Sequence, residues 1–83
     1  MKVGVFGAAG RMGQEVCRAV EADPVLNLVA RVDPQLGNDA SAMTEAGAEV
    51  AIDFTVASSA LANARWCAAH RVHAVIGTSG LSD

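Results

Sequence analysis

Aromatic residues are scarce in this chain of 83 residues, which contains one tryptophan, two phenylalanines and no tyrosine. Hydrophobic residues nevertheless make up 52% of the chain, and alanine and valine supply most of them. A core of such small side chains is typical of helices packed closely on a parallel sheet. The length allows one small domain at most, and a charged fraction of 18% argues against disorder.

Basic residues are also few, because six lysines and arginines stand against nine aspartates and glutamates, for a net charge of −3. This balance leaves no basic footprint for nucleic acid. No apolar run approaches the length of a membrane span. Glycines interrupt the short apolar run after Lys2, so we expect no signal peptide. Cys17 and Cys67 are isolated, and we expect both to be reduced helix residues of a cytoplasmic protein.

Short apolar runs alternate with helical periodicities along the chain. They predict four strands, at residues 2–6, 26–32, 49–54 and 72–76. They also predict helices at 10–22 and 57–70, with a helical turn or two at 41–46. This alternation implies right-handed crossovers and hence an α/β fold, a Rossmann-type parallel sheet with flanking helices. The chain stops soon after the fourth strand, and we expect the domain to be truncated.

Apolar positions in the two longer helices predict which side faces the sheet. The predicted inward residues are Met12, Val16, Ala19 and Val20 in the first helix, and Leu61, Ala64 and Ala68 in the second. Ser58 has the residue type of an N-cap and stands near the start of the second helix.

The segment Gly7-Ala8-Ala9-Gly10-Arg11-Met12-Gly13 follows the first strand and carries the most informative pattern. Gly7 permits a tight turn, Gly10 a close approach of backbone to ligand, and Gly13 close packing of the helix on the sheet. Unpaired N–H groups at a helix N-terminus suit the pyrophosphate of a dinucleotide. Gln14 stands where a Walker A loop needs lysine, which excludes that motif. A glycine-rich connector without a ligand is the alternative interpretation.

Asp33 ends the second predicted strand, twenty residues after Gly13. A carboxylate there can accept hydrogen bonds from the ribose hydroxyls of an adenosine. The alternative is that Asp33 only begins the turn with Pro34. Asp33 would repel a 2′-phosphate, whereas Arg11 either attracts one or is simply solvated. NADH with tolerance for NADPH is therefore the expected cofactor.

The third and fourth strands also end in polar residues. If buried, Asp53 needs a partner, and it is placed to accept hydrogen bonds from loop N–H groups. Phe54 belongs either to the core or to the wall of a cofactor cleft. The segment Gly77-Thr78-Ser79-Gly80 offers backbone donors and two hydroxyls, although a simple turn is the alternative. His70 and His73 have no accompanying ligand cluster, so no metal site is expected.

Three blocks of sequence resemble the dihydrodipicolinate (4-hydroxy-tetrahydrodipicolinate) reductases of lysine and diaminopimelate biosynthesis. The blocks are residues 3–13, Ile52-Asp53-Phe54-Thr55, and Val75-Ile76-Gly77-Thr78-Ser79-Gly80. The resemblance implies an N-terminal dinucleotide-binding domain at 1–83, which is incomplete, in a homotetrameric reductase that accepts NADH or NADPH. Such an enzyme transfers hydride to a cyclic imine-type dicarboxylate. The cofactor-binding residues expected from the pattern and the resemblance are Gly7, Ala8, Ala9, Gly10, Arg11, Met12, Gly13, Asp33, Phe54, Thr55, Gly77, Thr78 and Ser79.

Two departures from the family pattern bear on function. Ser79 replaces the usual threonine but keeps the hydroxyl. The family's His-His pair, lysine and Asp-Ala-Pro-Ser-Gly-Thr stretch have no counterpart, so no catalytic residue is expected in this chain, which alone should be inactive. Other interpretations are an amino-acid or homoserine-type dehydrogenase, a non-catalytic NAD(H) sensor, and a structural domain without ligand.

Overall fold

The computed structural model describes residues 1–77 as alternating strands and helices. In chain order the elements are β1 (Lys2–Phe6), α1 (Arg11–Ala22), β2 (Asn27–Val32), the 3-10 helix η1 (Pro34–Leu36), α2 (Ser41–Ala46), β3 (Val50–Asp53), α3 (Ala57–Ala69) and β4 (His73–Ile76). The four predicted strands, both long helices and the short helix at 41–46 are therefore confirmed. Their ends differ from the predicted ends by one residue at most.

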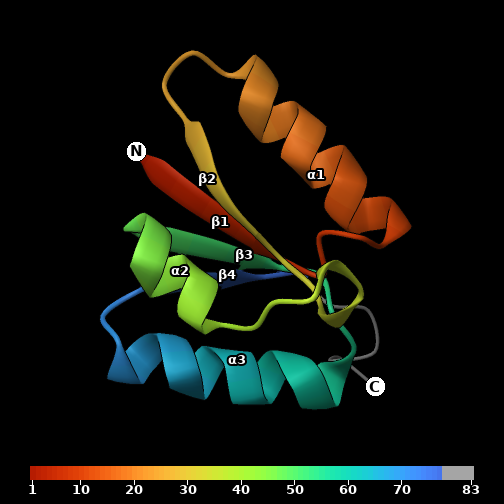
Figure 1. The fold of residues 1–83 in the computed structure, drawn as a ribbon, viewed down its shortest axis with the longest axis vertical. Coiled ribbons are helices and arrows are strands. Elements are labelled where there is room, and N and C mark those ends of the chain that lie inside the picture. Colours follow the sequence, from red (N-terminus) through yellow and green to blue (C-terminus); the bar gives the residue numbers. More distant parts are fainter. Residues whose placement is uncertain (78–83) are drawn as a thin grey trace.

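The strands form one parallel sheet in the order β2-β1-β3-β4. The chain moves from β1 to β2 on one side and then returns past β1 to β3, so the direction of winding reverses at β1. Figure 1 shows α1 on one face of the sheet and α2 and α3 on the other, with the carboxyl ends of the strands converging. Ligands of open α/β sheets bind at such a reversal, beyond the carboxyl ends of the strands.

Small side chains fill the core on both faces of the sheet. Val5, Ala8 and Cys17 form the buried cluster under α1. The larger cluster, under α2 and α3, contains Phe6, Ala30, Val32, Met43, Ala48, Ala51, Cys67 and Val72. The ring of Trp66 meets that of Phe6 edge-on, with centroids 6.5 Å apart. The expectation of a core with few aromatic residues is confirmed.

The inward face of α1 differs from the predicted one. Gly13, Cys17 and Val20 are its buried residues, whereas Met12 is 50% exposed and Ala19 is exposed. Only Val20 of the predicted face is fully buried. Because α1 approaches the preceding loop closely at Gly13, the side of the helix that contains Gly13, Cys17 and Val20 turns inward and Met12 turns out.

The predicted face and cap of α3 are also wrong. Ala60 and Cys67 are buried, whereas Leu61 is 55% exposed. Val56 is the N-cap residue, and no side chain in the described part of the chain caps the helix. Ser58 therefore lies inside the first turn. The alanines of α3 are distributed over several sides of the helix, so hydrophobic spacing alone does not predict which side faces the sheet.

Met43 of α2 packs on a floor of very small residues. The side chain of Met43 is fully buried. In the sheet, Gly4 of β1 lies between its two pairing partners, Ala30 of β2 and Ala51 of β3. A Cβ atom added to Gly4 would lie 2.0 Å from the Met43 sulfur and 3.3 Å from the Ala30 Cβ. Gly4 is therefore the space into which Met43 fits.

A double-mutant cycle tests this fit. We expect Gly4→Ala to destabilise by about 1–3 kcal/mol through overpacking and Met43→Ala by about 2–5 kcal/mol through a cavity. The double variant should lose less than the sum, by about 0.5–3 kcal/mol, because the new methyl group fills part of the cavity. Denaturant unfolding of all three variants measures this coupling, and strictly additive losses would contradict the packing.

Candidate functional site

The loop after β1 turns back on itself through its own backbone. Gly7 has a left-handed backbone with φ 75°, which favours glycine at this position. The N–H groups of Gly7 and Ala8 donate to the carbonyl of Val32, at 2.8 and 3.2 Å, and that of Gly10 donates to the carbonyl of Gly7, at 3.1 Å. The loop is thus tied to the end of β2 before α1 begins.

Gly13 brings α1 into contact with this loop. A Cβ atom at Gly13 would lie 1.9 Å from the carbonyl oxygen of Gly7 and 2.9 Å from the α-carbon of Ala8. Both neighbours are backbone atoms, so the clash could be relieved only by moving the helix or the loop. Gly13 was predicted to let the helix lie close to the sheet, whereas the backbone that it approaches is that of the loop after β1.

Gly10 has a different environment. It is exposed and is the N-cap residue of α1, with an extended backbone that any residue can adopt. An added Cβ would meet only the Gly7 carbonyl oxygen, at an ordinary 3.4 Å. The fold therefore does not require glycine here, and the absence of a side chain leaves the helix end open to a ligand.

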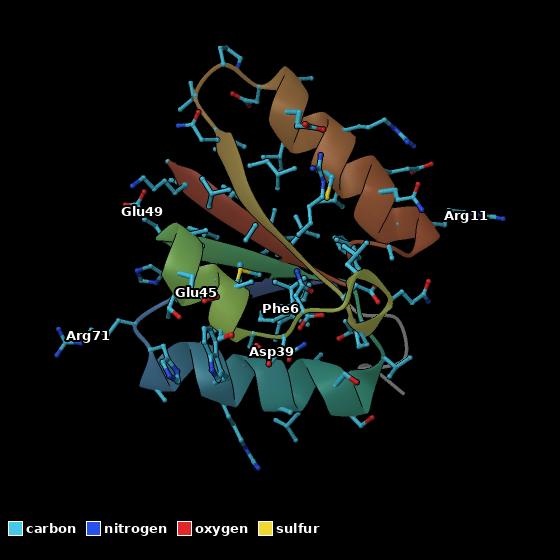
Figure 2. The ribbon with its side chains drawn as sticks, in the orientation of Figure 1. Phe6, Arg11, Asp39, Glu45, Glu49 and Arg71 are labelled. Atoms are coloured by element: carbon cyan, nitrogen blue, oxygen red, sulfur yellow. The ribbon has the colours of Figure 1, made fainter. Side chains whose placement is uncertain are left out.

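The N-terminus of α1 presents unpartnered donors at this open end. Within residues 1–77, the N–H groups of Arg11, Met12 and Gly13 find no protein acceptor, and no side chain caps the helix. Such donors and the positive end of the helix dipole attract an anion. The Arg11 side chain is exposed and points away from the body of the molecule (Figure 2).

Asp33 lies beside this loop and already has two partners. Its carboxylate is 8% exposed and accepts hydrogen bonds from the N–H of Ala9, at 3.1 Å, and from that of Gln35, at 2.9 Å. Asn38 accepts a bond from the N–H of Asp33 and donates to the carbonyl of Arg31. Asp33 therefore links the glycine loop to η1, while each carboxylate oxygen keeps a free lone pair.

A pocket of about 220 Å³ opens between the loops that follow β1, β2 and β3. It is lined by Phe6, Gly7, Val32, Asp33, Pro34, Asn38, Asp39, Ala40, Thr55, Ser59 and Asn63. Hydrogen bonds from the Ser41 hydroxyl and backbone N–H lower the pKa of Asp39, so this carboxylate is ionised at neutral pH. A pocket with carboxylates in its wall suits hydroxyl or amine donors, in contrast to the anion site at α1.

Asp53 links α3 to the loop after β3. Its side chain is 2% exposed and accepts bonds from the Thr55 N–H, at 2.8 Å, and hydroxyl, at 2.6 Å. The third donor is the side-chain amide of Asn63, at 3.0 Å. The expectation that Asp53 accepts hydrogen bonds from loop N–H groups is confirmed. Asn63 was missed because its partner lies ten residues away on another element.

Phe54 and Thr55 flank the glycine loop on the side of β3. The ring of Phe54 lies over Gly77, where an added Cβ would come within 2.5 Å of it. Thr55 places its methyl group against Gly7, where an added Cβ would be 3.1 Å away. Both side chains are half-buried. Thr78 and Ser79, also predicted to contact the cofactor, lie outside the described residues.

A second pocket, of about 360 Å³, lies between α1 and β2. Its wall includes Arg31, which forms an ion pair with Glu21 at 3.0 Å. Hydrogen bonds to Cys17 and Glu21 raise the pKa of Arg31. The charges of Arg31 and Glu21 neutralise each other. Of the described residues of the glycine loop, Ala8 and Ala9 alone line this pocket, so we assign it no ligand.

Residues 1–77 also lack the features of a metal centre and of a membrane-spanning helix. No three histidine, cysteine, aspartate or glutamate side chains there come together as metal ligands. In the same part of the chain, no helix has the length and apolar character needed to cross a membrane.

The fold and the loop together define a nucleotide-binding domain of the Rossmann type. The family model for the N-terminal part of dihydrodipicolinate reductase matches residues 1–83. The chain belongs to this family of reductase domains.

Named relatives agree with the family assignment. The 4-hydroxy-tetrahydrodipicolinate reductase of Corynebacterium aurimucosum is 48% identical over all 83 residues, which span 33% of that protein. The enzyme of the same name from Streptomyces coelicolor is 42% identical over 83 residues, or 32% of its length. The chain thus spans about a third of the curated relatives that it matches.

A solved structure has the same fold. Dipicolinate-bound dihydrodipicolinate reductase from Paenisporosarcina sp. TG-14 superposes on the whole chain with a TM-score of 0.81, at 24% sequence identity. The match covers 39% of that reductase. It supports the order and arrangement of strands and helices described above.

The different surroundings of the two glycines predict different effects on stability. Alanine at Gly13 gains about 1 kcal/mol in helix propensity, but the backbone clash should outweigh this, since overpacking costs about 3 kcal/mol or more in such a site. Gly10→Ala should cost about 1 kcal/mol or less, as the loss of a favourable N-cap residue. Denaturant unfolding measures both, and equal losses would contradict the geometry.

Proposed function

We propose that this chain is the cofactor-binding part of an NAD(P)H-dependent 4-hydroxy-tetrahydrodipicolinate reductase of lysine and diaminopimelate biosynthesis. The observation that carries the proposal is the pairing of two unlike sites at one edge of the sheet. Unpartnered N–H groups at α1 attract an anion, and the adjoining pocket offers carboxylates to hydrogen-bond donors. A pyrophosphate joined to an adenosine ribose complements both sites, because the pyrophosphate is an anion and the ribose hydroxyls are hydrogen-bond donors.

Each part of the site has its own task in this proposal. The backbone from Gly7 to Gly13 holds the pyrophosphate, and Gly10 lets it approach the N–H groups of α1. Asp33 accepts bonds from the adenosine ribose with its free lone pairs. Phe54, Thr55 and Gly77 flank the path towards the nicotinamide, and Thr78 and Ser79 are assigned to it by their sequence pattern alone. When bound, the reduced nicotinamide supplies the hydride.

The substrate-binding and catalytic residues belong to other segments of the whole reductase in this proposal. The relatives are about three times as long as the chain. Strand β4, at the edge of the sheet, leaves Val75 55% exposed and Ile76 38% exposed, which is typical of a surface covered by further protein. The residues outside this domain would bind the dicarboxylate substrate, supply protons and form the tetramer. The free cysteines, Cys17 and Cys67, suit an enzyme of the cytoplasm.

Cofactor titration tests the proposal. Calorimetric titration of NADH and NADPH into the intact protein should give saturable binding of at least one of them. Gly10→Ala should weaken that binding about tenfold or more, because a methyl group stands between the pyrophosphate and the helix N–H groups. Its unfolding free energy should stay close to that of the wild type. If neither dinucleotide binds the folded protein, the proposal is wrong.

Asp33→Ala tests the assignment of the ribose site. The variant loses a carboxylate acceptor for two ribose hydroxyls, so NADH affinity should fall about 10- to 100-fold, in line with about 1.5–3 kcal/mol for hydrogen bonds to such groups. NADPH affinity should fall less, because removal of the carboxylate also relieves repulsion of the 2′-phosphate. Asp33→Ala also leaves the Ala9 N–H without its acceptor, which should weaken NADH and NADPH equally. The ratio of the two affinities therefore reports on the ribose contact alone. A larger loss for NADPH would contradict the assignment.

A further inference from the structure

We propose that Asn63 is a positioning residue for cofactor binding, which holds the wall of the dinucleotide site in place through Asp53 and Thr55. The inference rests on the proposed function, because it assigns a task to a residue behind the same site. Asn63 lies on α3, and neither the glycine loop nor the strand ends contain it. Its link to the site consists of hydrogen bonds and one packing contact.

The first step of the link is the buried carboxylate of Asp53. A carboxylate that is 2% exposed is costly unless hydrogen-bond donors surround it. Thr55 supplies two donors to one oxygen, and Asn63 supplies the donor to the other, at 3.0 Å. Among residues 1–77, no other side chain donates a hydrogen bond to that second oxygen. Asn63 therefore fixes the rotation of the carboxylate.

The second step runs from Asp53 to the glycine loop. A fixed carboxylate orients both the N–H and the hydroxyl of Thr55. Thr55 in turn lies against Gly7, where an added Cβ would be only 3.1 Å from its methyl group. The loop after β3 thereby supports the loop after β1, on the opposite side from Asp33. Without the Asn63 donor, the carboxylate can rotate and Thr55 is no longer held against Gly7.

Asn63 also lies in the wall of the 220 Å³ pocket, together with Thr55 and Asp33. A change in the Asp53–Thr55 pair would therefore alter the width of the pocket and the support of the loop at once. Ser58, in the first turn of α3, is exposed and is not among the described residues that line this pocket. Ser58 is thus a control for the loss of a polar side chain from the same helix outside the binding site.

The test compares NADH affinity by calorimetry in the intact wild-type protein and in Asn63→Ala, Asn63→Asp and Ser58→Ala. We expect Asn63→Ala to weaken NADH binding about tenfold, as for the loss of one donor to a buried carboxylate. Ser58→Ala should stay within about twofold of the wild type, since changes of one exposed side chain away from the site are small. Thermal unfolding of each variant shows whether the domain is folded during the titration.

Asn63→Asp separates positioning from general stability. At about pH 8 the introduced carboxylate faces Asp53 and repels it, so binding should be weak. At about pH 5.5 the introduced carboxyl group, beside a like charge, takes up a proton and can donate to Asp53 again. The ratio of variant to wild-type affinity should therefore recover as the pH falls. The other titratable groups that line the same pocket or lie near Asp53, namely Asp33, Asp39 and Cys67, are the same in both proteins. The ratio therefore reports on the pair formed by Asp53 and the side chain at position 63.

The possible results are distinct. Wild-type protein that binds no dinucleotide overturns the proposed function itself. Wild-type binding with unchanged affinity in Asn63→Ala overturns the positioning role alone. If Asn63→Ala does not fold, the pH recovery of Asn63→Asp decides: recovery supports the role, and an affinity ratio that is flat with pH overturns it.

Discussion

The contact between Gly13 and the carbonyl group of Gly7 is the constraint on which the rest of the site depends. It sets the distance between α1 and the loop after β1, because no side chain can stand between them. The first turn of the helix is thereby held at the carboxyl edge of the sheet, where its N–H groups find no acceptor among residues 1–77. The same approach turns Cys17 and Val20 inward.

Two buried carboxylates support this loop, one on each side of β1. Asp33, after β2, accepts the N–H of Ala9, and Asp53, at the end of β3, holds Thr55 against Gly7. Each charge is balanced by donors of the protein, as buried charges require. A site built in this way is organised before a ligand arrives, so less ordering is needed when a cofactor binds.

Local patterns predicted the elements well, because apolar spacing and glycine or proline breaks act over a few residues. The ends of β1 and α1 and the resemblance to the reductase family follow from such patterns. The helix faces were predicted wrongly, with Met12 and Leu61 turned inward. In an alanine-rich helix the orientation is set by steric fit with distant backbone, which hydrophobic spacing does not contain. The fit of Met43 over Gly4 is of the same kind.

By itself, the sequence determined the order of strands and helices, the parallel sheet and the glycine loop, because these follow from local propensity and connection rules. It also placed Asp33 and Asp53 at strand ends. Only the tertiary structure decided which groups these carboxylates meet, and it brought Asn63 to Asp53 and Thr55 to Gly7. Those contacts join residues far apart in the chain. They arise because the strand order β2-β1-β3-β4 places the loops after β1, β2 and β3 next to one another.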